Sequence, residues 1–369
     1  ENSLKRVHYQ LLRGLFIIMK TGPNVKKTIA NNPFFISICI PSYNRPPGLR
    51  RLLESIDSKR YENDIQIVIC EDNAPKRAEV AEVVRRYELS SPYTVKYVEN
   101  EINLGHGANW RQCSNQASGE FLIYMGDDDD FIPGALDPYI YWVKANRNLG
   151  YILRAYRSIL KNGAIEYHNY YPGDKYFEPG IKAYTQFFLK SMLMSGYTIK
   201  REFANRYQES SLDDTLYFQM YLVAEICLKY PSAYCHIPIS QFIGDGVSYF
   251  GTNNVEREMF TPGVNAAGNL TTFRNMFKIT NFVDNKYGLE STEIIRMELS
   301  KYSSYPTMCI YRQFGIKQFI ASSRELRKIG LDKSNYFNLY FFALLLFGEK
   351  FCNNIVRLIK RIIGRRLQL

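Results

Sequence analysis

The feature that most constrains this chain is an alternation, beginning at Phe34, of short apolar runs with longer segments of mixed polarity. Short apolar runs bounded by turn residues indicate strands, and amphipathic segments of roughly ten residues or more indicate helices. The predicted strands span residues 35–40, 65–70, 94–98 and 120–125, and the predicted helices span residues 47–57, 76–89 and 108–117. Repeated β-α units build a mostly parallel sheet covered by helices, so the predicted fold class is α/β.

The remaining chain extends this domain and then becomes helical. Predicted elements are a helix near 134–145, a strand near 151–160, a return strand near 164–170, a helix over 212–228 and a strand with a loop over 233–251. Helical spacing with few turn signals follows from residue 266 to 330. We therefore expect a basic N-terminal arm over residues 1–33, an αβ domain over 34–255, a helical extension over 256–334 and a tail over 335–369.

The net charge of +11 comes almost entirely from the two ends of the chain. Residues 1–33 and residues 349–369 each carry six basic side chains against one glutamate. The aromatic residues of the central domain are not interleaved with basic ones, which argues against a nucleic-acid partner. Seven cysteines, scattered and without zinc-site spacing, indicate reduced thiols in the cytoplasm. The chain has no initiator Met and no clear cleavage site, so a signal peptide is not expected.

The tail combines an apolar run with a basic amphipathic segment. Residues 336–347 are apolar, but this run is shorter than the ~20 residues that span a bilayer. Ile355, Leu358, Ile359 and Ile362 then recur at helical spacing among Arg and Lys residues. This pattern predicts peripheral attachment to an anionic membrane surface, at the inner face of the cell membrane. The alternative is a helical hairpin packed on the core, or an oligomer contact.

Four loops follow the predicted strands at the carboxyl edge of the sheet, where parallel sheets bind ligands. They contain Pro41-Ser42-Tyr43-Asn44-Arg45, Glu71-Asp72-Asn73, Asn103-Leu104-Gly105 and the acidic run Asp127-Asp128-Asp129-Asp130. Like charges ~4 Å apart repel by roughly 4 kcal/mol at an effective dielectric of ~20. Each loop alone has a simple explanation, as a helix cap, a turn or a solvated loop. Together they indicate a divalent metal that bridges the acidic edge to a diphosphate.

These loops carry a resemblance to a known family. The four motifs above, with Gly119 to Gly126 before the aspartates and Pro133 after them, resemble family 2 glycosyltransferases of GT-A fold over roughly residues 34–251. The resemblance implies a GT-A domain with a mostly parallel, mixed sheet. It also implies an inverting transfer of a sugar from a nucleoside diphosphate sugar, assisted by Mn²⁺ or Mg²⁺.

The resemblance also implies roles for individual residues. Pro41 and Tyr43 would lie beside the nucleobase, and Asp72 would accept its imide or amino hydrogen. The other predicted donor-binding residues are Arg45, Asn103, Gly105, Asp127 and Asp129.

The predicted metal ligands are Asp128, the best match, with Asp129 and Asp245. Many family members carry an acid where Gly126 stands, so the division of roles among the aspartates stays open. Asp245 lies in Gly244-Asp245-Gly246, which is either an extra metal site or only a turn.

An inverting transfer needs a general base, which removes the proton of the attacking hydroxyl. In the family this base is an acid that opens a helix after the sheet. Asp213 and Asp214 precede an apolar helical segment here, and Asp214 corresponds best to the base, with Asp213 as the second choice. The alternative explanation is that Asp213 only caps the helix.

The predicted function is the transfer of a hexose or deoxyhexose to a lipid-linked saccharide acceptor in the synthesis of a surface polysaccharide, such as O-antigen or capsule. A sugar-phosphate nucleotidyltransferase is a second possibility, although Pro41-Ser42-Tyr43-Asn44-Arg45 is not the glycine-rich loop that such enzymes usually carry. Release of pyrophosphate rather than nucleoside diphosphate would favour it. A third possibility is a non-catalytic module that binds nucleotide or membrane.

Overall fold

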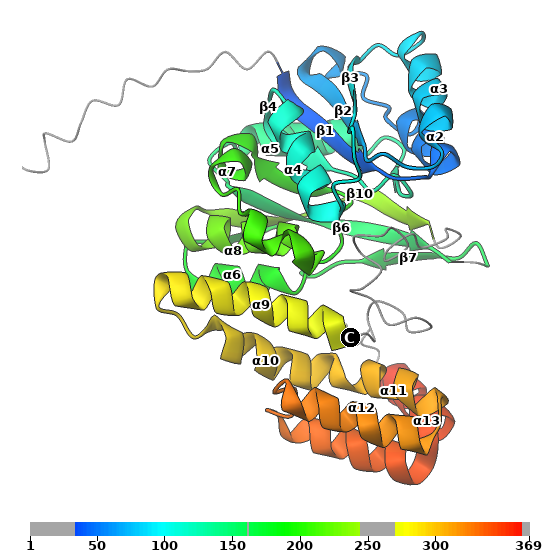
Figure 1. Cartoon of the computed structure of the whole chain (residues 1–369), viewed down its shortest axis with the longest axis vertical. Coiled ribbons are helices and arrows are strands. Elements are labelled where there is room, and N and C mark those ends of the chain that lie inside the picture. Colours follow the sequence, from blue (N-terminus) through cyan, green and yellow to red (C-terminus); the bar gives the residue numbers. More distant parts are fainter. Residues whose placement is uncertain (1–33, 161, 244–269, 364–369) are drawn as a thin grey trace, which may run out of the picture. The chain divides into compact units, whose positions relative to one another are not determined.

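The computed structural model describes residues 34–160, 162–243 and 270–363 (Figure 1). The N-terminal arm predicted over residues 1–33 lies outside these residues.

A ten-stranded mixed sheet forms the centre of the αβ domain, in the order β3-β2-β1-β4-β9-β6-β10-β5, with β7 paired to β6 and β8 to β10. The pairs β1–β2, β1–β4, β2–β3 and β6–β10 are parallel. Antiparallel pairing joins β9 to both β4 and β6. The strands are β1 (Phe34–Ser42), β2 (Ile65–Glu71), β3 (Thr94–Glu99), β4 (Gly119–Tyr124), β5 (Asp130–Phe131), β6 (Tyr151–Ile159), β7 (Ile165–His168), β8 (Lys175–Phe177), β9 (Tyr197–Lys200) and β10 (Ser232–Ile243).

The helices of the αβ domain cover both faces of this sheet (Figure 1). Helices α2, α3 and α5 pack on one face, and α4, α6, α7 and α8 on the other. They are α2 (Pro46–Glu54), α3 (Arg77–Glu88), α4 (His106–Gln116), α5 (Leu136–Ala145), α6 (Ile181–Phe188), α7 (Arg201–Arg206) and α8 (Phe218–Lys229), with short 3₁₀ helices η1 (Glu62–Asp64) and η2 (Ser210–Thr215).

Alternation along the strands divides the core into two layers. In β4, Phe121 and Ile123 face the α2–α3–α5 layer, whereas Leu122 and Tyr124 face the opposite layer. Strands buried on both faces read as continuous apolar runs, which is why β1, β2 and β4 were predictable to within two residues of their observed ends. The helix predicted over 212–228 is wrong at its start. Leu216 has a left-handed backbone (φ 62°) that separates η2 from α8.

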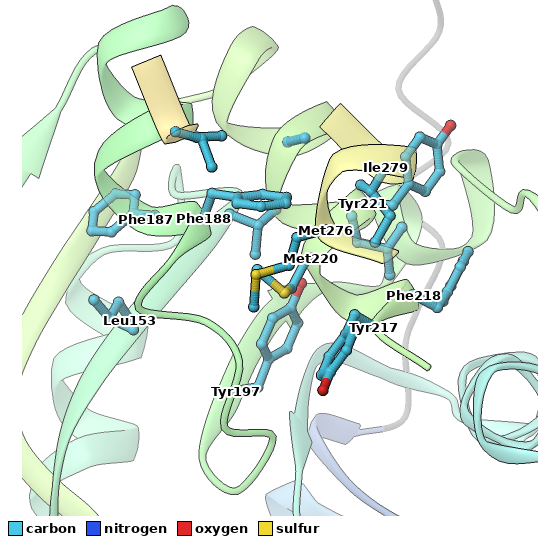
Figure 2. Packing of buried hydrophobic residues seen from close by; sticks show 14 of the residues in the cluster. Leu153, Phe187, Phe188, Tyr197, Tyr217, Phe218, Met220, Tyr221, Met276 and Ile279 are labelled. Atoms are coloured by element: carbon cyan, nitrogen blue, oxygen red, sulfur yellow. The ribbon is translucent and has the colours of Figure 1, made fainter. Parts of the chain in front are cut away.

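The C-terminal extension is helical, as predicted, and it shares the core of the αβ domain. Figure 2 shows Phe188 of α6 and Met220 and Tyr221 of α8 packed near Met276 of α9. The extension consists of α9 (Leu270–Tyr287), α10 (Ser291–Tyr302), α11 (Ser304–Gln313), α12 (Ile316–Lys328) and α13 (Asn335–Ile363). The hydrophobic cluster is continuous from Leu153 of β6 to Phe337 of α13.

A buried carboxylate on α8 joins the αβ domain to α9. Glu225 is fully buried and accepts hydrogen bonds from Lys286 Nζ (2.6 Å), Tyr287 Oη (2.6 Å) and Lys229 Nζ (2.9 Å). Burial raises the pKa of Glu225, but these hydrogen bonds outweigh burial and leave the pKa below its usual value. Because two of the donors lie on α9, Glu225 fixes the extension to the αβ domain.

Replacing Glu225 with glutamine is expected to lower the free energy of unfolding by about 1–2 kcal/mol, because charge-assisted hydrogen bonds to partly solvated lysines are lost. A carboxyl with a lowered folded-state pKa contributes stability at neutral pH and loses that contribution as the pH falls. The difference between the wild type and the variant, measured by urea unfolding, should therefore shrink below roughly pH 4. Glu82→Gln on the exposed face of α3 is the control, and it should leave the midpoint unchanged. Equal midpoints for Glu225→Gln and the wild type would contradict this role.

Candidate active site

The first aspartate of the acidic run is buried and holds the loop after β1. Asp127 Oδ2 accepts hydrogen bonds from Ser42 Oγ (3.0 Å) and Tyr43 N (2.8 Å), and Oδ1 accepts one from Arg45 Nη1 (2.8 Å). Burial raises the pKa of Asp127 and the charge of Arg45 opposes this effect. The structure therefore brings the predicted donor-binding residues Tyr43, Arg45 and Asp127 together, with Asp127 as the residue that shapes the loop.

Helix α2 contacts the acidic run through Arg51. Arg51 donates from Nε to Asp130 Oδ1 (2.8 Å) and from Nη2 to the carbonyl of Asp128 (2.6 Å). A Cβ on Gly48 would lie 2.4 Å from the carbonyl oxygen of Asp127, so only glycine lets α2 approach this closely. Asp130 thus anchors the loop through Arg51, and it was not among the predicted site residues.

Asp128 and Asp129 differ from these two anchors. The Asp128 side chain is about one-third exposed, and its Oδ2 lies 3.4 Å from Arg45 Nη2. Asp129 is 9% exposed; its Oδ2 accepts a hydrogen bond from Ser195 Oγ, and its Oδ1 has no hydrogen-bond partner among the described residues. Burial, and then the charge of Asp128, raises the pKa of Asp129 to about 7. An exposed carboxylate beside a buried, unpartnered oxygen is a donor set that suits a hard divalent cation.

The predicted metal site is incomplete in protein ligands. Within the described residues, no three His, Cys, Asp or Glu side chains are grouped as a metal site. Mg²⁺ characteristically takes one or two carboxylates and completes its shell with substrate phosphates and water, so Asp128 and Asp129 alone fit such an ion. Asp245, the third predicted ligand, lies outside the described residues.

Gly126, where many family members carry an acid, is closely surrounded by side chains. A Cβ at this position would lie 2.9 Å from Asp128 Oδ1 and 3.3 Å from Ser195 Oγ. A side chain here would therefore require the Asp128 or the Ser195 side chain to move.

The second predicted carboxylate, Asp72, organises the glycine turn before α4. Its carboxylate accepts hydrogen bonds from Asn100 Nδ2 (3.0 Å), Leu104 N (2.8 Å) and Gly105 N (2.9 Å). Asn103 Nδ2 donates to the Asp72 carbonyl oxygen (2.8 Å). Burial raises the pKa of Asp72, and these hydrogen bonds partly offset the rise. The structure thus joins Asp72, Asn103 and Gly105 in one network.

Glu71, beside Asp72, shapes its own loop. This fully buried carboxylate accepts hydrogen bonds from Ala74 N (2.6 Å) and Arg77 Nε (2.6 Å). Asn73 adopts φ 51° in the same turn. Pro41 stands opposite Cys70 in the β1–β2 register, so it lies at the same sheet edge.

The two candidate bases lie in η2 and have different partners. Asp213 forms an ion pair with Arg111 of α4, and Gly107 of α4 packs against the Asp213 backbone. Asp214 is 59% exposed and accepts two hydrogen bonds of 2.7 Å from Lys278 of α9. The alternative that Asp213 caps the helix is wrong, because Glu209 caps η2 and no side chain caps α8.

A family profile for "Glycosyl transferase family 2" matches residues 37–201. An uncharacterized glycosyltransferase of Haemophilus influenzae is 28% identical over 36% of this chain and 42% of its own length. The GalNAc(5)-diNAcBac-PP-undecaprenol beta-1,3-glucosyltransferase of Campylobacter jejuni is 26% identical over 32% of this chain and 36% of its own length. Abequosyltransferase RfbV of Salmonella typhimurium is 32% identical over 26% of this chain and 28% of its own length. The chain thus spans less than half the length of these curated relatives.

A solved structure supports the fold over a longer stretch. S. aureus TarS 1–349 in complex with UDP-GlcNAc aligns with a TM-score of 0.53 and 12% identity, covering 87% of this chain and 92% of TarS 1–349. Residues 37–201 of the αβ domain therefore match glycosyltransferase family 2, and the domain has the GT-A fold, as both predictions expected.

Proposed function

We propose that the chain is a metal-dependent, inverting glycosyltransferase that moves a sugar from a nucleoside diphosphate sugar to a saccharide acceptor. The main support is the pair Asp128 and Asp129 at the ligand-binding edge of a family 2 domain. Asp128 offers a partly exposed carboxylate, and Asp129 offers an oxygen, Oδ1, without a hydrogen-bond partner among the described residues. Asp127 and Asp130, on either side of the proposed ligands, form ion pairs with Arg45 and Arg51, which hold both ends of the acidic run.

The residues at this edge have different proposed roles in binding the donor. Asp128 and Asp129 would hold Mn²⁺ or Mg²⁺, which when bound stabilises the negative charge of the departing diphosphate. Arg45 adds a fixed positive charge beside Asp128. Pro41 and Tyr43 would contact the nucleobase. Asp72 would accept a hydrogen bond from the imide or amino group of the base at Oδ2. Within the described residues, this oxygen accepts one hydrogen bond, from Gly105 N, so it can accept another.

Asp214 is the proposed general base. Each carboxylate oxygen has more than one acceptor site, so the hydrogen bonds from Lys278 fix the side chain without using all of its lone pairs. Asp213 forms an ion pair with Arg111 of α4. The same helix begins directly after Gly105, whose backbone N–H donates to Asp72. Helix α4 therefore connects the Asp72 network to η2, the short helix that carries the proposed base.

The proposed acceptor is a saccharide on a lipid carrier, in the synthesis of a surface polysaccharide. The names of the Campylobacter and Salmonella relatives support this, since one acts on an undecaprenol-linked saccharide and the other transfers abequose. The functional test is to incubate the chain with UDP-, GDP- and dTDP-sugars and membrane lipid extract, with and without Mn²⁺. Metal-dependent formation of a glycosylated lipid with release of nucleoside diphosphate is expected. Release of pyrophosphate would indicate a nucleotidyltransferase, and donor binding without turnover would indicate a non-catalytic module.

We place the chain peripherally on the inner face of the cell membrane, through α13. Residues Asn335–Ile359 are long and apolar enough to cross a membrane, and only 11% of their most apolar stretch is buried. However, Gly348 (φ 76°) interrupts the helix, leaving parts of about 13 and 15 residues. Each part is roughly 20 Å long, which is shorter than the ~30 Å hydrocarbon core. Phe337 and Leu344 of the first part of α13 are buried, so one side of this part packs on the other helices of the extension. Such packing was the alternative to membrane binding.

Both parts of α13 also present exposed apolar side chains, namely Tyr336, Leu339, Phe342, Leu346, Phe347, Phe351 and Leu358, each more than half exposed. The double variant Phe342→Glu/Leu346→Glu is expected to lower binding to anionic liposomes at least about tenfold, because two large apolar side chains no longer enter the bilayer interface. Flotation with phosphatidylglycerol vesicles measures this. Tyr141→Glu, on the exposed surface of α5, is the control and should float like the wild type. Equal flotation of the double variant would contradict the membrane role.

A further inference from the structure

Ser195 is a junction between the acidic run and the interior of the sheet, and no motif marks it. Its Oγ donates to Asp129 Oδ2 and accepts a hydrogen bond from Gly126 N (3.1 Å). Its carbonyl oxygen accepts hydrogen bonds from Arg154 Nε (2.7 Å) and Ser240 Oγ (2.9 Å). Ser195 is 6% exposed, so both the side chain and the backbone are fixed by buried contacts.

Arg154 of β6 supports this junction with a buried charge. It is 1% exposed, it donates to the carbonyl oxygens of Ser195 and Leu193, and its guanidinium lies 5.3 Å from the ring centre of Tyr156. Within the described residues it forms no ion pair with a carboxylate. Gly196 lets the chain pass close to Arg154, since a Cβ there would lie 2.8 Å from Arg154 Nε. A buried cation without an ion-pair partner is costly unless nearby negative charge compensates it.

We propose that Ser195 is a positioning residue for the metal site: it binds one oxygen of Asp129 and leaves the other available as the ligand. The inference rests on the proposed metal-dependent function. Holding a buried carboxylate beside Asp128 opposes folding, because like charges repel and burial removes solvation. The charge-assisted bond from Ser195 and the positive charge of Arg154 behind it offset this repulsion before the cation arrives. Residues that orient metal ligands in this way typically change metal affinity by about 10- to 100-fold.

The experiment measures Mn²⁺ binding directly, by the loss of the electron paramagnetic resonance signal of free Mn²⁺, with UDP and, in parallel, with GDP present. Ser195→Ala is expected to weaken Mn²⁺ binding about 10- to 100-fold, and Ser195→Cys, a weaker donor of similar shape, by less. Ser240→Ala is the matched control. It removes a buried hydroxyl bond to the same residue but not the bond to Asp129, and it should keep Mn²⁺ affinity within about twofold.

Thermal unfolding of each variant separates binding from folding. Ser195→Ala that binds Mn²⁺ as tightly as the wild type overturns the inference, and so does an equal loss of affinity in Ser240→Ala. If the wild type itself binds no Mn²⁺ with either nucleotide, the metal-dependent function fails and the inference fails with it. Weak Mn²⁺ binding by Ser195→Ala, together with tight binding by the wild type and by Ser240→Ala, supports both the metal-dependent function and the role of Ser195.

Discussion

Replacing Asp128 with alanine is expected to reduce sugar transfer at least about 1,000-fold. Stabilisation of a departing diphosphate by a metal contributes several kcal/mol, and ~4 kcal/mol corresponds to about a thousandfold in rate. Asp128 is the more exposed of the two proposed metal ligands, so its loss removes a ligand without leaving a buried cavity. Initial rates of nucleoside diphosphate release, measured with saturating Mn²⁺, provide the test. Asp128→Asn should behave similarly, because a neutral amide does not replace a carboxylate toward a hard cation.

Asp130→Asn is the informative control within the same run. Its carboxylate is engaged by Arg51, so this variant should lower the melting temperature while reducing transfer less than about tenfold. The two variants thus separate a ligand from an anchor. Full turnover by Asp128→Ala, or a larger loss in Asp130→Asn than in Asp128→Ala, would remove the metal assignment.

Local patterns in the sequence were sufficient for most of the fold. Strands β1, β2 and β4 were predictable because each contains a short apolar run, and β3 because apolar and polar residues alternate along it. The strand β9 (Tyr197–Lys200) was not predicted, although it inserts antiparallel between β4 and β6. A strand of four residues is too short to show a clear pattern of apolar and polar residues in the sequence. Its conformation is fixed by pairing with β4 and β6.

The site shows the same division between local and long-range information. The acidic run, the Asp72 loop and the Asp213–Asp214 pair are each contiguous in sequence, so their motifs could single them out as candidates. Nothing local distinguishes the roles of Asp127 and Asp129, because the partners that separate them are Arg45 and Ser195, 82 and 66 residues away along the chain. Residues that act through such distant contacts carry no signature in a single sequence.

The second large effect is expected at Asp214. Asp214→Asn should lower the turnover number by about 10²- to 10⁴-fold, the usual contribution of a general base, since an amide cannot take the proton of the attacking hydroxyl. Donor affinity should stay within about twofold, because Asp214 belongs to η2 and not to the loops that would bind the nucleotide. Turnover at saturating donor and calorimetric titration of the donor measure the two quantities separately. A loss confined to turnover is the signature of a base.

Asp213→Asn distinguishes the two aspartates of η2. Its ion pair with the largely buried Arg111 holds η2 against α4, so this variant should lose thermal stability and reduce turnover by less than about tenfold. The reverse pattern, in which Asp213→Asn is inactive and Asp214→Asn is active, would move the base to Asp213. Lys278→Met completes the series: if the lysine only fixes the Asp214 side chain, its loss should lower turnover less than Asp214→Asn does and leave donor binding unchanged. Since Lys278 lies on α9, a turnover defect in this variant would also tie the helical extension to the catalytic step.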